Sequence, residues 1–149
     1  MEKRIKTIVN VIYDMDTDKS IVLRAFNKLF FDFIDDVISI YPDNVEMLSA
    51  RDAFLTFKKL NPTCIAKVWH TSVYNVYKSE LDSGNLDFFT EKDYSIDLTN
   101  SNVQNTKSIL GMIDKVRDPI KNMSEANKAQ VAKYIQNLNK LSNAYNSIA

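Results

Sequence analysis

Three aspartates alternate at Asp14, Asp16 and Asp18, which is the spacing with which a calcium-binding EF-hand loop begins. The remainder of such a loop is missing, because Lys19 stands where the sharp turn needs glycine and Ala25 stands where a bidentate glutamate belongs. Carboxylates are also favoured just before a helix, whose N-terminus carries partial positive charge. We therefore expect these residues to form an acidic helix cap and to bind no metal.

Cys64 and His70 are the only cysteine and the only histidine in the chain, so they alone could form a nucleophilic cysteine–histidine pair. Six residues on a helix separate two side chains by about 120° around the axis and about 9 Å along it. A single histidine also excludes a zinc site with several histidine ligands from one chain. We interpret Cys64 as a small core residue and His70 as packed or half exposed.

The adjacent acids Asp35 and Asp36 are a third candidate, since paired carboxylates can act as general acid and base. Adjacent side chains on a helix point about 100° apart, so these two would not face each other across a cleft. The sequence also contains no glycine-rich phosphate loop, no GxSxG and no HExxH. It predicts no catalytic residue, no metal and no cofactor, and we expect a protein that is not an enzyme.

Residues 84–98, GNLDFFTEKDYSIDL, combine aromatic and acidic side chains directly after a glycine. Two interpretations stay open. The rings fold back as a lid on the protein's own core, or they stay exposed as anchors for a partner protein, because a rigid ring buries much area at low entropic cost. Under the second interpretation, the candidate partner-binding residues are Phe88, Phe89, Tyr94 and Asp97.

The composition of the chain limits the folds and the kinds of partner that are compatible with these residues. The chain has 149 residues, the size of one domain, and its 19 basic and 19 acidic residues give no basic excess to attract nucleic acid. No stretch approaches the roughly 18 to 20 apolar residues that a membrane span requires, and the start of the chain lacks the features of a secretory signal. With two glycines and three prolines, the chain has little turn chemistry for a sheet.

The sequence therefore predicts an all-α fold, a single-domain bundle of about five helices across residues 1–149. Residues 1–18 are rich in β-branched side chains and admit a strand, a helix or an extended N-terminal arm. Residues 20–41 predict the central helix, which is apolar apart from one narrow polar stripe and ends before Pro42. The stripe consists of Arg24, Lys28, Asp32, Asp35 and Ser39.

A second helix is expected from a cap at Asp43 or Asn44 to residue 60. Its predicted inner face is Met47, Leu48, Phe54, Leu55 and Phe57. The pair Asn61-Pro62 predicts the start of a third helix that runs toward Leu81 and stops at Ser83-Gly84. The apolar residues of this helix are Ile65, Trp69, Val73, Val76 and Tyr77.

A fourth helix is expected to begin near Asn102 and to end or bend at Pro119. Its predicted buried edge is Ile109, Ile113, Val116 and Ile120. Ser124 caps the last helix, which continues to about Ser147 and carries two rows of apolar residues at heptad spacing. These rows, Val131, Leu138 and Tyr145 with Tyr134, Leu141 and Ile148, either pack within the bundle or meet a partner.

The succession of segments resembles a known group of proteins. FNKLFFDFIDDVISIYPDN, KKLNP with a tryptophan eight residues after Asn61, residues 84–98, and the tail from IDKVRDPIKN to LSNAYN carry the resemblance, which covers about Ala25 to Asn146. Together they resemble small helical proteins of unassigned function encoded by large double-stranded DNA viruses of algae and amoebae. No catalytic signature accompanies this group.

The resemblance implies a non-enzymatic interaction protein, most concretely a minor structural or cementing capsid component. Such a protein would be found in the virion, and in the host cytoplasm during assembly. Its partners would be other proteins, above all capsid components. From composition alone, we expect no nucleic-acid partner and no membrane span. The alternative is an intracellular viral adaptor or regulatory protein that binds a host or viral partner.

Overall fold

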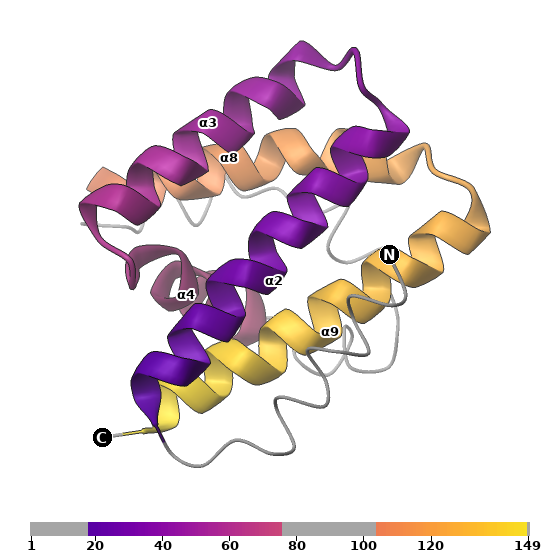
Figure 1. Cartoon of the computed structure of the whole chain (residues 1–149). Helices are drawn as coiled ribbons and strands as arrows, with labels where there is room; N and C mark the ends of the chain where they lie inside the picture. The colour runs from indigo at the N-terminus through magenta and orange to yellow at the C-terminus, as the bar shows by residue number, and fades with distance from the viewer. Residues whose placement is uncertain (1–17, 76–103, 149) are drawn as a thin grey trace.

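The computed structural model describes residues 18–75 and 104–148, with side chains in the second range described from Ser108 onward. All regular structure in these ranges is helical, which confirms the all-α prediction (Figure 1). The π-helix η1 continues α4 directly, so the two form one continuous unit and the described residues hold five helical units, as predicted. The elements are α2 (Lys19–Ile40), α3 (Val45–Leu60), α4 (Cys64–Trp69), η1 (His70–Tyr74), α8 (Gln104–Lys121) and α9 (Glu125–Ser147).

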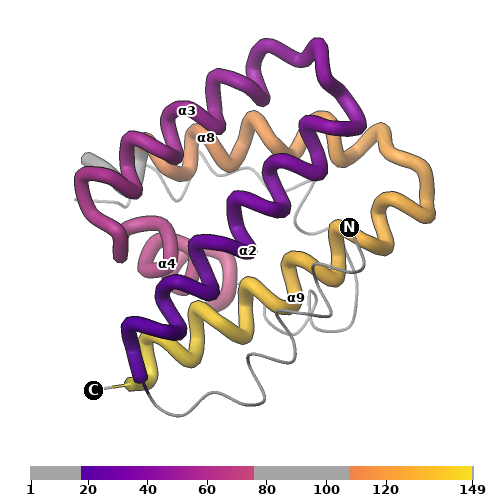
Figure 2. The backbone as a smooth tube through the Cα atoms, in the orientation of Figure 1, coloured from indigo at the N-terminus to yellow at the C-terminus, as the bar shows by residue number. Residues whose placement is uncertain are grey.

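Helix α2 is the central element, as its apolar circumference predicts, and it contacts α3, α4, α8 and α9. Figure 2 shows α3 beside α8 on one side of the molecule, with α2 running from the C-terminal end of α9 to the start of α3. The helix starts at a cap in which the Asp18 carboxylate accepts the Ser20 backbone N–H at 2.9 Å. It ends at Ile40, two residues before Pro42, as predicted.

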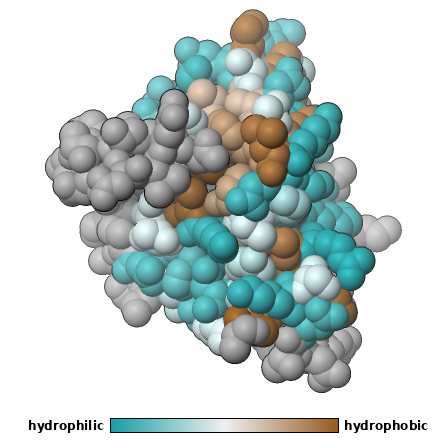
Figure 3. All heavy atoms as spheres, turned by 90° about the vertical axis from the view of Figure 1, so that its left-hand side faces the viewer, coloured by the Kyte–Doolittle hydropathy of each residue, from teal (hydrophilic) through white to brown (hydrophobic). Residues whose placement is uncertain are grey.

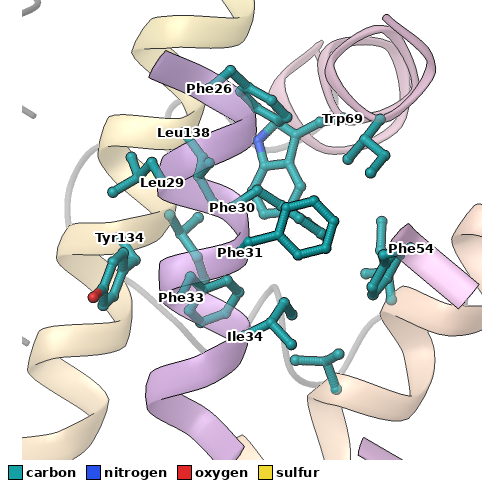
Figure 4. Close-up of a cluster of buried hydrophobic side chains, with 14 of the residues drawn as sticks. Phe26, Leu29, Phe30, Phe31, Phe33, Ile34, Phe54, Trp69, Tyr134 and Leu138 are labelled. Atoms are coloured by element: carbon teal, nitrogen blue, oxygen red, sulfur yellow. The ribbon is translucent and has the colours of Figure 1, made fainter. Parts of the chain in front are cut away.

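The core is built around aromatic side chains that converge from three helices (Figure 4). Phe30 of α2 meets Phe54 of α3 edge to face, with ring centroids 4.8 Å apart, and Trp69 of α4 at 6.2 Å. Phe26, one turn earlier on α2, lies 6.4 Å from Trp69. All four side chains are at most 1 % exposed, so Phe30 joins three helices at the centre of the fold.

Asn44 rather than Asp43 caps α3, by accepting the Met47 N–H at 3.1 Å. The prediction that Leu48 lies on the inner face is wrong, because this side chain is 42 % exposed. The buried stripe of α3 is narrow, and Leu48 points about 100° away from Met47, which lies within it. Met47 and Phe54 are buried as predicted, Leu55 and Phe57 are partly buried, and Ala50 is buried without having been predicted.

The third predicted helix begins later than expected. The Asn61 side chain accepts the backbone N–H and the hydroxyl of Thr63, so that it forms a turn ahead of α4, and the helix starts at Cys64. Ile65, Trp69 and Val73 are buried as predicted. The predictions for Val76, Tyr77, Leu81 and the Ser83-Gly84 stop lie outside the described residues.

Helices α8 and α9 follow the prediction closely. Ile109, Ile113, Val116 and Ile120 form the buried edge of α8, which ends two residues past Pro119. The Ser124 hydroxyl caps α9 by accepting the Asn127 N–H at 3.2 Å. Both apolar rows of α9 pack within the bundle, mostly against α2, with only Ile148 partly exposed.

Candidate functional site

Among the acids that suggested metal or acid–base chemistry, the three that the structure describes, Asp18, Asp35 and Asp36, have structural partners instead. Asp18 caps α2, and the hydrogen bonds from the Ser20 hydroxyl and the Ser20 N–H lower the pKa of its carboxyl group. Asp14 and Asp16 lie outside the described residues. Within residues 18–75 and 104–148, no three potential metal-binding side chains come together.

Asp35 and Asp36 point toward different helices. The Asp35 carboxylate pairs with Arg51 of α3, whose Nε donates to Oδ1 at 2.5 Å and whose Nη2 donates to Oδ2 at 3.4 Å. The Asp36 carboxylate accepts a hydrogen bond from the Tyr134 hydroxyl of α9. The two acids therefore hold α3 and α9 against α2, and they do not form a carboxylate pair.

Cys64 and His70 also have separate partners. The Cys64 thiol is buried and donates to the Phe57 carbonyl oxygen at 3.5 Å, and burial raises its pKa, which suppresses the reactive thiolate. The His70 ring stacks on Tyr74 with centroids 5.1 Å apart. His70 is half buried, in agreement with the sequence-based interpretation.

The predicted partner-binding residues Phe88, Phe89, Tyr94 and Asp97 lie outside the described residues. The choice between a lid and a contact surface stays a prediction for these four residues. A candidate site must therefore be sought on the surface that the structure describes.

An open groove of about 420 Å³ lies between the first half of α2 and the second half of α3. Its apolar part comes from Leu23 and Phe31 of α2, Leu55 of α3 and Pro62, and its polar part comes mainly from basic side chains. The lining residues are Leu23, Arg24, Asn27, Lys28, Phe31, Asp32, Arg51, Leu55, Lys58 and Pro62. We call this feature the α2–α3 groove.

Two of the four basic side chains in the groove already have carboxylate partners. Lys28 pairs with Asp32 at 2.9 Å, and Arg51 pairs with Asp35. Arg24 and Lys58 differ, because no carboxylate of the described residues lies within ion-pair distance of either. The Arg24 Nε donates to the Ser20 carbonyl oxygen at 3.4 Å, and the Lys58 ammonium lies 5.4 Å from the centre of the Phe31 ring.

Asn27 fixes the end of the groove. This side chain is 5 % exposed, and its Nδ2 donates to the Pro62 carbonyl oxygen at 3.0 Å, which ties α2 to the turn between α3 and α4. Its buried Oδ1 has no hydrogen-bond partner among the described residues. The groove wall is thus held by a directional contact between segments 35 residues apart in the chain.

Sequence reasoning missed this groove, although part of the signal was visible. The spacing of Arg24 and Lys28 places both on the polar stripe of α2, and Arg51 and Lys58 are seven apart on α3. Each pair predicts one basic helix face. That the two faces border the same groove depends on how α2 packs against α3, which helical periodicity does not determine.

Exposed apolar side chains do not provide a comparable site. The large ones in the described part of the chain are Ile21, Val45, Leu48 and Leu60. Figure 3 shows brown atoms in separate patches among teal atoms on the face it presents. Single exposed apolar residues are normal on protein surfaces. The α2–α3 groove is therefore the stronger candidate, since it combines apolar and charged groups in one concave feature.

No family model matches the chain, and no curated protein or solved structure matches it significantly. The described helices include none that is both long enough and apolar enough to cross a membrane. The class of protein that the fold defines is thus an all-α helical bundle with a basic, partly apolar groove on its surface.

Proposed function

We propose that this chain is a non-enzymatic helical interaction protein that uses the α2–α3 groove to contact another protein. The observation that carries the proposal is the combination of Arg24 and Lys58, which have no carboxylate partner among the described residues, with apolar groups at Leu55 and Phe31. Protein contact sites combine apolar anchors with surrounding polar groups in this way. The titratable candidates that the structure describes are engaged otherwise: Asp18 in a cap, Asp35 in an ion pair, Asp36 in a hydrogen bond, and Cys64 and His70 in packing.

A photo-crosslinking experiment tests this proposal. A photoreactive amino acid replaces Lys58, which lines the groove, or Lys59, which is also exposed and points about 100° away on α3. We expect the chain with the probe at residue 58 to form a covalent product with a partner protein in cells that express it naturally, and the chain with the probe at residue 59 to form none. Equal yields at the two positions, or no product at either, would contradict a groove-specific contact.

The particular role we propose is that of a minor structural or cementing component of a large DNA-virus particle, present in the virion and in the host cytoplasm during assembly. Its support is the sequence resemblance of residues 25–146 to small helical proteins of such viruses. The test is mass spectrometry of purified particles of the virus that encodes the chain. We expect an abundance near that of other minor capsid proteins. Absence from particles together with a crosslinked partner in cells would favour the intracellular adaptor.

A further inference from the structure

The charges of the α2–α3 groove define what it can bind. Lys28 and Arg51 are neutralised by Asp32 and Asp35, whereas Arg24 and Lys58 keep their charge without a carboxylate from the described residues. The lining of the groove therefore holds four cations and one carboxylate, that of Asp32. Asp35 pairs with Arg51 at the border, and the carboxylates of Asp52 and Asp18 act electrostatically on Arg51 and Arg24 from outside the lining. A ligand that brings its own carboxylates to Arg24 and Lys58 completes the pairing and disrupts no existing ion pair.

The apolar part of the groove adds a second requirement. Leu55 is partly buried and presents apolar surface that a ligand could cover, and Phe31, at 8 % exposure, adds a small part of its ring. A volume of about 420 Å³ accepts a few side chains and not a folded domain. An aromatic or aliphatic side chain on Leu55 and Phe31 would bury apolar area between the two cations.

We propose that the α2–α3 groove binds a short acidic segment of a partner protein, which places an aromatic or aliphatic side chain against Leu55 and Phe31 and carboxylates beside Arg24 and Lys58. This inference rests on the proposed function and adds the chemistry of the partner. Nucleic acid fits less well, because the carboxylates of Asp32 and Asp35 repel phosphates. The apolar part of the groove also makes no favourable contact with a backbone phosphate. The chain as a whole also has no net positive charge.

The test measures binding of a fluorescein-labelled synthetic peptide, GNLDFFTEKDYSIDL, to the full chain by fluorescence anisotropy. This peptide repeats residues 84–98 of the chain and serves as a probe of the required composition. It carries four acids, one lysine and three aromatic residues. We expect saturable binding that weakens as NaCl is raised from about 0.05 to about 0.5 M, because salt screens exposed charges. The same peptide with its acids changed to amides, GNLNFFTQKNYSINL, is expected to bind about ten-fold more weakly or worse.

Matched protein variants locate the site. Arg24→Glu with Lys58→Glu is expected to weaken peptide binding by about ten-fold or more, whereas Lys59→Glu with Lys140→Glu makes the same change of net charge at exposed residues outside the groove and retains binding. For the apolar requirement, Leu55→Asn is expected to weaken binding, and Leu48→Asn, seven residues earlier on α3 and outside the groove, is expected to leave it unchanged.

Four results would overturn the inference. The first is the absence of saturable peptide binding, or equal losses in the groove variants and their controls. The second is tighter binding of a labelled single-stranded oligonucleotide of similar length. The third is a wild-type dimer that the Arg24→Glu/Lys58→Glu variant abolishes without any peptide binding, which would assign the groove to a second copy of the chain. A groove-specific crosslink to a partner through a non-acidic segment would also reject the acidic chemistry while leaving the proposed function intact.

Discussion

The two sides of α2 differ in how polar groups are used. On the side that faces α4 and α9, α2 packs mainly through apolar side chains, and the hydrogen bond from Trp69 Nε1 to Asn139 Oδ1 at 2.8 Å, which joins α4 to α9 beside it, is buried. On the side that faces the groove, charges are numerous and half exposed, and Arg24 and Lys58 have no carboxylate partner within residues 18–75 and 104–148. The first arrangement fixes a unique packing, whereas the second leaves charge available to a ligand.

The largest expected effect tests the buried side. Phe30→Ala should lower the free energy of unfolding by about 3 to 5 kcal/mol, because it removes a ring that touches α3 and α4 and leaves a cavity. Ile21→Ala, on the same helix at 40 % exposure, should change it by less than about 0.5 kcal/mol. Urea denaturation measures both values. A similar loss in the two variants would show that Phe30 is not at the centre of the core.

A smaller effect separates hydrogen bonding from packing on the same side. Trp69→Phe leaves the buried Asn139 side chain without its donor, which should cost about 1 to 3 kcal/mol beyond the loss of ring volume. The same change in an Asn139→Leu background should cost less, because no buried carbonyl is then left unpaired. A double-mutant cycle by chemical denaturation gives the coupling. Additive losses would mean that this hydrogen bond contributes nothing specific.

The ion pair next to the groove should be weaker than the buried contact. Arg51 and Asp35 have side chains that are 33 % and 40 % exposed, so solvent screens their attraction. A double-mutant cycle with Arg51→Ala and Asp35→Ala should give a coupling below about 1 kcal/mol. If that coupling exceeded the one between Trp69 and Asn139, the proposed contrast between the two sides of α2 would be wrong.

The smallest expected effect is a pH dependence at the start of α2. The hydrogen bonds from Ser20 lower the pKa of Asp18 in the folded chain below the ordinary value of 3.8. Its ionised form therefore stabilises the fold above that pH, and this contribution is lost as the pH falls through the lowered folded pKa. Asp18→Asn keeps a good cap without the charge. The stability difference between wild type and variant should shrink on acidification below about pH 4, as measured by thermal unfolding across that range.

The sequence predicts the fold well because local signals determine most of it. Caps at Asn44 and Ser124, the stop before Pro42 and the apolar periodicity of α8 all act within one or two turns of helix. Leu48 was misplaced because the width of a buried stripe depends on the neighbouring helix. The late start of α4 reflects competition between a turn and a cap at Asn61, which use the same side-chain oxygen.

The candidate site was not predictable to the same degree. The basic residues of α2 and α3 are visible in the sequence, but the groove exists because Asn27 binds the Pro62 carbonyl oxygen and Phe30 packs on Phe54. These contacts join positions far apart in the chain. That Asp35 and Asp36 contact different helices was predictable, because adjacent side chains on a helix point about 100° apart.

A charge-reversal experiment tests the central claim most directly. The affinities of the wild-type chain and of the Arg24→Glu/Lys58→Glu variant are measured for the acidic peptide of residues 84–98 and for a counterpart in which its four acids are lysines. We predict an exchange of preference, in which the wild type binds the acidic peptide and the variant binds the basic one. If the variant bound neither peptide better than the wild type does, or if both chains bound both peptides equally, the α2–α3 groove would not be a site for an acidic partner.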